Sequence, residues 1–204
     1  VLLSRRVVLY RCSQKVLCRV LRYQVGIFKG SPSRVAAFYA SPLPRAEGQI
    51  FPALLDIHGG GQSASLNTVI AYAKRGYVSL SLNWGGNPMQ IGAERWSGVQ
   101  TDWGKLDATH PPQRNKTNHF AGGIEPDEYT IDDQVSPRNS NWYVVLIAAR
   151  RAVSLLESMP EVDDKRIGAR GHSMGGKLTT NLAGIDPRII AAVPSCGGAG
   201  VVAA

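Results

Sequence analysis

The chain has 204 residues, of which 44% are hydrophobic and 19% are charged, a balance typical of a globular domain and not of a disordered one. Its net charge of +8 is concentrated near the N-terminus: nine of the 23 basic residues precede the first acid, Glu47, which leaves 14 against all 15 acids. A basic face across the whole chain is therefore excluded, and we expect no nucleic-acid partner. We interpret residues 1–22 as a solvated basic segment of unknown role.

No apolar run reaches the roughly 18 to 20 residues of a membrane-spanning helix, so no membrane partner is expected. The chain begins with Val1 and ends at Ala204, soon after a glycine-rich turn, which favours a piece of a longer protein. The compartment stays open, because a secreted or periplasmic location would need a signal upstream of Val1. The odd count of three cysteines leaves at least one thiol free or paired outside the chain. The oligomeric state is not indicated.

The first predicted elements are two short strands, residues 23–29 and 34–39, separated by Gly30-Ser31-Pro32, a hairpin signal. Residues 51–57 form a near-continuous apolar run, as expected for a strand buried on both faces of a parallel sheet. Residues 63–74 have helical spacing and end before Gly76, and residues 77–82 form the next strand.

A long stretch without sustained periodicity follows, and we interpret residues 84–141 as a lid-like insertion, since loops of this length are usually functional. Regular patterns return with a helix at 142–159, a strand at 166–170, a helix at 174–183 and a strand at 189–194. The alternation of strands and helices predicts an α/β fold, with a mostly parallel sheet and helices on both faces. Residues 23–204 would then form one domain.

The strongest motif is Gly171-His172-Ser173-Met174-Gly175, which fits G-x-S-x-G and lies between a predicted strand and a predicted helix. This sharp turn forces its central residue into a strained conformation and leaves room only for small neighbours. The serine hydroxyl is thereby exposed above the sheet. The helix N-terminus places the Met174 N–H where an oxyanion forms. The motif therefore predicts that Ser173 is a nucleophile.

A second motif, His58-Gly59-Gly60-Gly61-Gln62, follows the buried strand and precedes a helix. Consecutive glycines let the backbone turn tightly and present bare N–H groups to a ligand. The N–H groups of Gly60 or Gly61 would complete an oxyanion hole with Met174. A phosphate cradle is the alternative, but the phosphate-binding glycine patterns are absent.

Together these motifs resemble the α/β-hydrolase superfamily. More closely, the chain from about Tyr23 onward resembles bacterial acetylxylan esterases and related carbohydrate deacetylases with a dienelactone-hydrolase-like fold. The resemblance is carried by HGGGQ at 58–62, LNWGG at 82–86, TDWG at 101–104, PRNSNW at 137–142 and GHSMGGK at 171–177. It implies a serine esterase that removes acetyl or other short acyl groups, on a carbohydrate or a similar substrate, without a cofactor or metal.

The chain departs from that pattern after the nucleophile. The family order is serine, then an acid, then a histidine, yet only one acid, Asp186, and no histidine follow Ser173. Asp186 comes too early for the acid position. We therefore expect that the last strands, the acid and the base are missing. His110 or His119 of the insertion would be the stand-ins.

The four tryptophans, Trp84, Trp96, Trp103 and Trp142, all lie in or beside the insertion. Aromatic rings suit the apolar faces of sugars, so Trp84 and Trp103, with Gln62, are candidate substrate contacts; equally, the rings would anchor a long loop. Two alternatives to the esterase stay open: a non-catalytic domain that at most binds a ligand, and a serine peptidase of the same fold.

Overall fold

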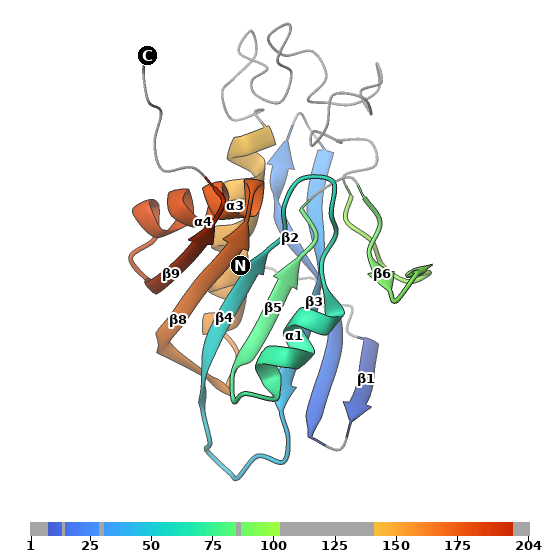
Figure 1. Ribbon diagram of the computed structural model, residues 1–204, viewed down its shortest axis with the longest axis vertical. Coiled ribbons are helices and arrows are strands. Elements are labelled where there is room, and N and C mark those ends of the chain that lie inside the picture. Colours follow the sequence, from blue (N-terminus) through green and yellow to red (C-terminus); the bar gives the residue numbers. More distant parts are fainter. Residues whose placement is uncertain (1–7, 14, 29–30, 85–86, 103–140, 198–204) are drawn as a thin grey trace, which may run out of the picture.

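The computed structural model describes residues 8–13, 15–28, 31–84, 87–102 and 141–197. Seven strands form one sheet in the order β1-β2-β3-β5-β4-β8-β9 (Figure 1). Pairing is parallel between β5, β4, β8 and β9, and antiparallel between β1, β2, β3 and β5. The strands are β1 Val8–Ser13, β2 Val16–Phe28, β3 Ser31–Pro42, β4 Phe51–Ile57, β5 Val78–Leu82, β8 Val162–His172 and β9 Ile189–Ser195.

Helices cover both faces of this sheet (Figure 1). Helix α1, Leu66–Ala73, packs on β5 and β3 on one face, while α3, Asn141–Glu157, and α4, Met174–Ile185, pack on the other. A separate two-stranded sheet, β6 Gln90–Ile91 with β7 Glu94–Arg95, lies in the segment after β5. The mostly parallel α/β sheet with helices on both faces, predicted from the order of elements, is confirmed; β1, β2 and β3 form an antiparallel edge to it.

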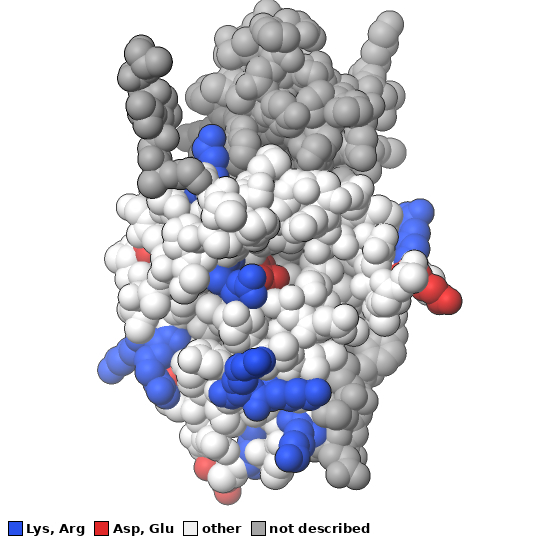
Figure 2. Space-filling view, viewed as in Figure 1, with Lys and Arg blue, Asp and Glu red and all other residues white. Residues whose placement is uncertain are grey.

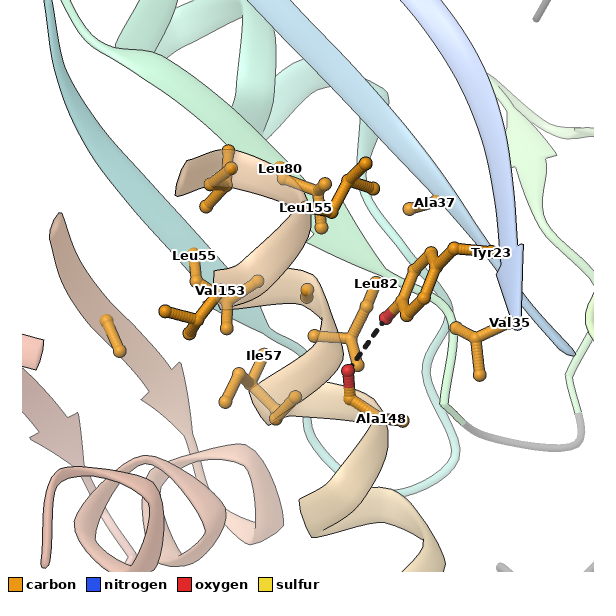
Figure 3. Packing of buried hydrophobic residues seen from close by; sticks show 14 of the residues in the cluster. Tyr23, Val35, Ala37, Leu55, Ile57, Leu80, Leu82, Ala148, Val153 and Leu155 are labelled. Atoms are coloured by element: carbon orange, nitrogen blue, oxygen red, sulfur yellow. Dashed lines mark hydrogen bonds between the residues drawn. The ribbon is translucent and has the colours of Figure 1, made fainter. Parts of the chain in front are cut away.

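The larger hydrophobic core lies between the sheet and α3 (Figure 3). The small residues Ala148, Ala149 and Ala152 of α3 are fully buried, so the helix approaches the strands closely. Leucines and isoleucines of β4 and β5 fill the space opposite them, and each contributes about 1.5–3 kcal/mol when buried. The hydroxyl of Tyr23 crosses this core to donate a hydrogen bond to the Ala148 carbonyl, 3.1 Å away.

The expected boundary after residue 22 lies inside a strand. Strand β2 runs from Val16 to Phe28 and pairs with β3 along its whole length. Val16, Cys18 and Val20 are buried in a second cluster beneath α1. The interpretation of a solvated segment is therefore wrong for residues 16–22, because alternate side chains of this stretch belong to the core. Cys18 is disulfide-bonded and Cys196 is a free, exposed cysteine.

The other predicted elements are confirmed, with changes at their ends. Strand β8 begins four residues earlier than residue 166 and continues to His172, whereas α1 begins only at Leu66, after the capping residue Ser65. Of the expected insertion, residues 87–102 are described and contain the β6–β7 hairpin; residues 103–140 lie outside the described residues. No helix in the described part of the chain is both long and apolar enough to cross a membrane.

Candidate active site

Ser173 lies at the junction of β8 and α4, at the carboxyl end of the parallel strands. Its backbone φ is 54°, a left-handed value that a residue with a side chain rarely adopts, and that costs about 1–3 kcal/mol. The Ser173 N–H donates to the Ser195 carbonyl at the end of β9, 2.8 Å away, and the Ser173 carbonyl accepts from Lys177 in α4. Ser173 is exposed. This strained, exposed geometry is the one that the motif predicts.

The glycines around Ser173 are required by close backbone contacts. A Cβ on Gly175 would lie 2.0 Å from the carbonyl oxygen of Ile57, and one on Gly171 would lie 2.3 Å from that of Gly175. A Cβ on Gly176 would lie 2.6 Å from the Ser195 carbonyl oxygen. Helix α4 can therefore start this close to β4 and β9 only because these positions carry no side chain.

The glycine-rich loop after β4 packs directly against Ser173. A Cβ on Gly59 would lie 3.5 Å from the Ser173 Cβ and 3.0 Å from the His172 carbonyl oxygen. The Gly59 N–H is already bonded to Gln62 Oε1 at 2.9 Å. Among the described residues no group accepts the N–H of Gly60 or Gly61. Met174 opens α4, so its N–H has no acceptor within the helix. The structure thus brings together the two loops that carry the predicted oxyanion donors.

Side chains from the segment after β5 hold this loop in place. Trp84 donates its indole N–H to the His58 carbonyl at 2.8 Å, and its ring stacks on the His58 ring at 5.0 Å. Asn87 donates its side-chain amide to the Gly61 carbonyl at 2.5 Å. Asn87 was not among the residues predicted from the sequence. Its distance of 26 residues from Gly61 along the chain left no local signal.

The candidate substrate contacts have different environments. Trp84 is only 2% exposed, so its ring offers no open face to a sugar. It packs against His58 and supports the glycine-rich loop. The Gln62 side chain is exposed but turns back onto Gly59. Trp103 lies outside the described residues. The anchoring interpretation, and not the stacking one, therefore describes Trp84.

The described residues do not place a base at the Ser173 hydroxyl. His58 is buried, and its Nδ1–H donates to the Gly59 carbonyl, 2.8 Å away. His172 points toward β9, where its Nδ1 lies 3.0 Å from Ser195 Oγ. His110 and His119 lie outside the described residues.

Asp186 caps the far end of α4, away from Ser173. Its carboxylate accepts from Arg188 at 2.7 Å and from Arg150 at 3.2 Å. These hydrogen bonds, the one from Arg188 foremost, lower the pKa of Asp186 to about 2 despite its burial. Its carboxylate is therefore engaged in tying α4 to α3, in agreement with the prediction that it is not the catalytic acid.

A groove of about 680 Å³ lies on the α1 face of the sheet, between α1 and β9. Tyr72 and Tyr77 line one side, and Ile190 and Val193 line the other. Figure 2 shows this face: most of its surface is uncharged, and the charged side chains visible on it are mainly lysines and arginines. Ser173 does not line this groove, so the groove is distinct from the candidate active site.

Comparison with known proteins gives a consistent family. A family model described as acetyl xylan esterase (AXE1) matches residues 13–197. The acetyl esterase Axe7A of Xylanibacter ruminicola is 27% identical over 124 residues, which are 60% of this chain and 23% of that protein.

Solved structures match over nearly the whole chain. Acetyl xylan esterase 1 from Thermoanaerobacterium sp. JW/SL YS485 matches with a TM-score of 0.64 and 21% identity, over 95% of this chain and 52% of that one. An acetyl xylan esterase from Paenibacillus sp. R4 matches with a TM-score of 0.62 and 20% identity, over 95% and 54%. These matches show the fold, and they confirm the α/β-hydrolase architecture. The chain spans about a quarter of the curated relative and about half of each solved one.

Proposed function

We propose a function from one premise: the chain belongs to the acetyl xylan esterase family. In this proposal the chain is the nucleophile-bearing part of a serine esterase that removes acetyl groups from a carbohydrate. The observation that carries it is the exposed Ser173 at φ 54°, with the glycine-rich loop packed against it. The acetyl xylan esterases among the relatives support the substrate class.

Acyl transfer would begin when the Ser173 Oγ attacks the carbonyl carbon of the acetyl ester. The carbonyl oxygen becomes an oxyanion, and the N–H groups of Met174 and of Gly60 or Gly61 would stabilise it. Each such donor contributes about 3–4 kcal/mol to the transition state. These donors are backbone groups, held by the start of α4 and by the hydrogen bonds of the glycine-rich loop, so little reorganisation is needed as the charge develops.

The sugar hydroxyl then leaves with a proton, and the acetyl group stays on Ser173 as an ester. Water attacks that ester, acetate is released and the serine hydroxyl is restored. Both steps need a base to carry the proton, since a serine hydroxyl at neutral pH is a poor nucleophile. By the resemblance to the family, the base would be a histidine oriented by an acid; the described residues place neither beside Ser173.

The test is ester hydrolysis by the protein with every residue that its gene encodes, on p-nitrophenyl acetate and on acetylated xylan. We expect release of acetate from both, abolished by Ser173→Ala and unchanged by Ser158→Ala, an exposed serine at the other end of the sheet. The 204-residue chain alone should show little turnover.

Three results would contradict the proposal. Hydrolysis that survives Ser173→Ala would remove the serine from the mechanism. Cleavage of peptides in place of acetyl esters would favour a peptidase of the same fold. If the gene ends at Ala204 and the chain is inactive, a ligand-binding role replaces the esterase.

A further inference from the structure

Three neighbouring parallel strands carry polar side chains in one row, on the α1 face near the carboxyl end of the sheet. Asp56 of β4 is in register with Ser81 of β5 on one side and with Arg170 of β8 on the other. The Ser81 hydroxyl donates to Asp56 Oδ2 at 2.8 Å, and Arg170 Nε lies 3.4 Å from Asp56 Oδ1. Asp56 is only 6% exposed.

Helix α1 closes this row into a ring. The N–H of Ser65, which caps the start of α1, donates to Ser81 Oγ at 3.0 Å. Nearer the other end of the helix, Arg170 Nη1 donates to the Tyr72 hydroxyl at 3.2 Å, and its guanidinium lies 5.6 Å from the centre of the Tyr72 ring. The ring therefore connects β5, β4, β8 and both halves of α1.

The members of this ring flank the two loops of the candidate active site. Asp56 is two residues before His58, where the glycine-rich loop begins, and Ser65 follows where that loop ends. Arg170 is three residues before Ser173 on the same strand. On this face of the sheet, the groove separates α1 from β9. The link from Arg170 to Tyr72 and Asp56 thus spans the gap between the helix after the oxyanion loop and the strand that carries the nucleophile.

We infer that Asp56, Ser81 and Arg170 are positioning residues that hold the glycine-rich loop at a fixed position relative to Ser173. The inference rests on the proposed function, and it adds residues that touch neither substrate nor oxyanion. A displacement of 1 Å in an active-site loop can reduce the rate about 100-fold. A buried ion pair suits this task, since its directional bonds fix geometry, whereas an apolar pair would fill the space without fixing it.

We expect Asp56→Asn to leave the stability of the fold largely unchanged. Burial raises the pKa of Asp56 more than the Ser81 hydrogen bond and the Arg170 charge lower it. The charged form is thus less favourable in the folded chain than in water, and a neutral residue of the same shape should not weaken the fold. Asp56→Asn therefore separates a positioning role from a purely structural one.

The experiment compares Asp56→Asn, Arg170→Met and Tyr72→Phe with Arg166→Met in the protein with every residue that its gene encodes. Arg166 is the matched control, because it lies on the same strand, lines the same groove and pairs with Asp163, an acid outside the ring. For p-nitrophenyl acetate we expect kcat to fall about 10- to 100-fold in Asp56→Asn and Arg170→Met, by analogy with the loss of one oxyanion donor. KM should change less than about twofold.

Tyr72→Phe keeps the ring under Arg170 and removes one hydrogen bond, so a smaller loss of kcat, about two- to fivefold, is expected. Arg166→Met should leave kcat unchanged. Thermal unfolding of each variant shows whether a loss of rate merely follows a loss of folded protein. Tyr72→Phe keeps the inference testable if Arg170→Met does not fold.

A second readout is independent of catalysis. Hydrogen–deuterium exchange of the amides of residues 58–65 should be faster in Asp56→Asn than in the wild type, while that of α4 stays the same. Unchanged kcat in Asp56→Asn, with activity still dependent on Ser173, overturns the inference and leaves the esterase intact. If the wild type hydrolyses no ester, the proposed function fails, and unchanged exchange at residues 58–65 then overturns the positioning role as well.

Discussion

Two buried carboxylates lie at opposite ends of the sheet, and their surroundings shift their pKa values in opposite directions. Glu161, just before β8 at the amino end, is 3% exposed; Asp56, near the carboxyl end of β4, is 6% exposed. Glu161 accepts from the Tyr39 hydroxyl at 2.7 Å and faces Arg19 at 3.6 Å and Arg45 at 3.4 Å. Asp56 has one hydroxyl donor and one arginine.

The pKa values of the two groups diverge accordingly. Burial raises the pKa of Glu161, but the Tyr39 hydrogen bond and the charges of Arg45 and Arg19 outweigh burial, so its pKa lies below the usual value. For Asp56, burial prevails and the pKa is raised. Ionised Glu161 thus favours the folded state at the amino end, whereas at the carboxyl end the buried Asp56 carboxylate and the strained backbone of Ser173 oppose it. Strained conformations of this kind cluster at functional sites.

The largest effect is expected at Ser173 itself. Ser173→Ala should lower kcat of the full protein about 10³-fold or more, with its unfolding free energy nearly unchanged. Ser173→Gly should be equally inactive but more stable by about 1 kcal/mol, because glycine adopts φ 54° without strain. Urea unfolding of both variants measures this difference. Equal stability of the two would show that the carboxyl end stores no strain at this residue.

The next effect concerns close packing beneath Ser173. Gly175→Ala should destabilise the protein by about 2–3 kcal/mol, because the added methyl meets the Ile57 carbonyl oxygen at 2.0 Å. Gly184→Ala is the matched control in the same helix, where a Cβ meets nothing within 4 Å. It should stabilise by about 0.5–1 kcal/mol. Similar denaturation midpoints for both variants would contradict the close contact between α4 and β4.

At the amino end, Glu161→Gln should reduce stability by about 1–3 kcal/mol at neutral pH, because the arginines lose their buried partner, and should leave kcat unchanged. A lowered carboxyl pKa contributes stability above the unfolded value of about 4.3, and this contribution is lost as the pH falls through the folded pKa. The gap between wild type and Glu161→Gln should therefore close between about pH 5 and pH 3. Asp164→Asn, which changes an exposed acid nearby, is the control and should change little.

For Asp56 the sign is reversed. A raised pKa means that any stability gained from the carboxyl group is present below its unfolded value, about 3.9, and is lost as the pH rises through the folded pKa. Stability curves of Asp56→Asn and wild type should therefore diverge toward neutral pH in favour of the variant. Parallel curves would remove the contrast between the two ends.

The smallest effect is expected at the start of α1. Ser65→Ala removes the hydroxyl that accepts from the Thr68 N–H at 3.1 Å, which should cost about 1 kcal/mol. Its backbone N–H, which reaches Ser81, remains, so kcat should change little compared with Asp56→Asn. Ser63→Ala, outside the helix, is the reference in thermal unfolding. An equal effect at Ser63 would assign the loss to something other than capping.

The elements around the candidate site were predictable because their signals are local. The turn at 171–175 is dictated by steric limits among adjacent residues, and the placement of Ser173 beside the 58–62 loop follows from the rule that carboxyl ends of parallel strands share one edge. The N-terminal strands were missed for a physical reason. Arginines interrupt the apolar pattern of residues 16–22. The stretch is a strand because its alternate side chains are buried against α1, while Arg22 pairs with Asp102 outside the core.

By itself, the amino-acid sequence determined the order of the main-sheet strands and helices from β4 onward, and it singled out Ser173 as the candidate nucleophile with the loop opposite it, since each depends on residues close together in the chain. Only the tertiary structure decided which distant groups meet. The register of β5, β4 and β8 aligns Ser81, Asp56 and Arg170. Packing buries Trp84 against the glycine-rich loop, whereas the sequence alone left it as a candidate substrate contact. Such contacts arise from strand pairing and burial, and neither is visible in a single stretch of sequence.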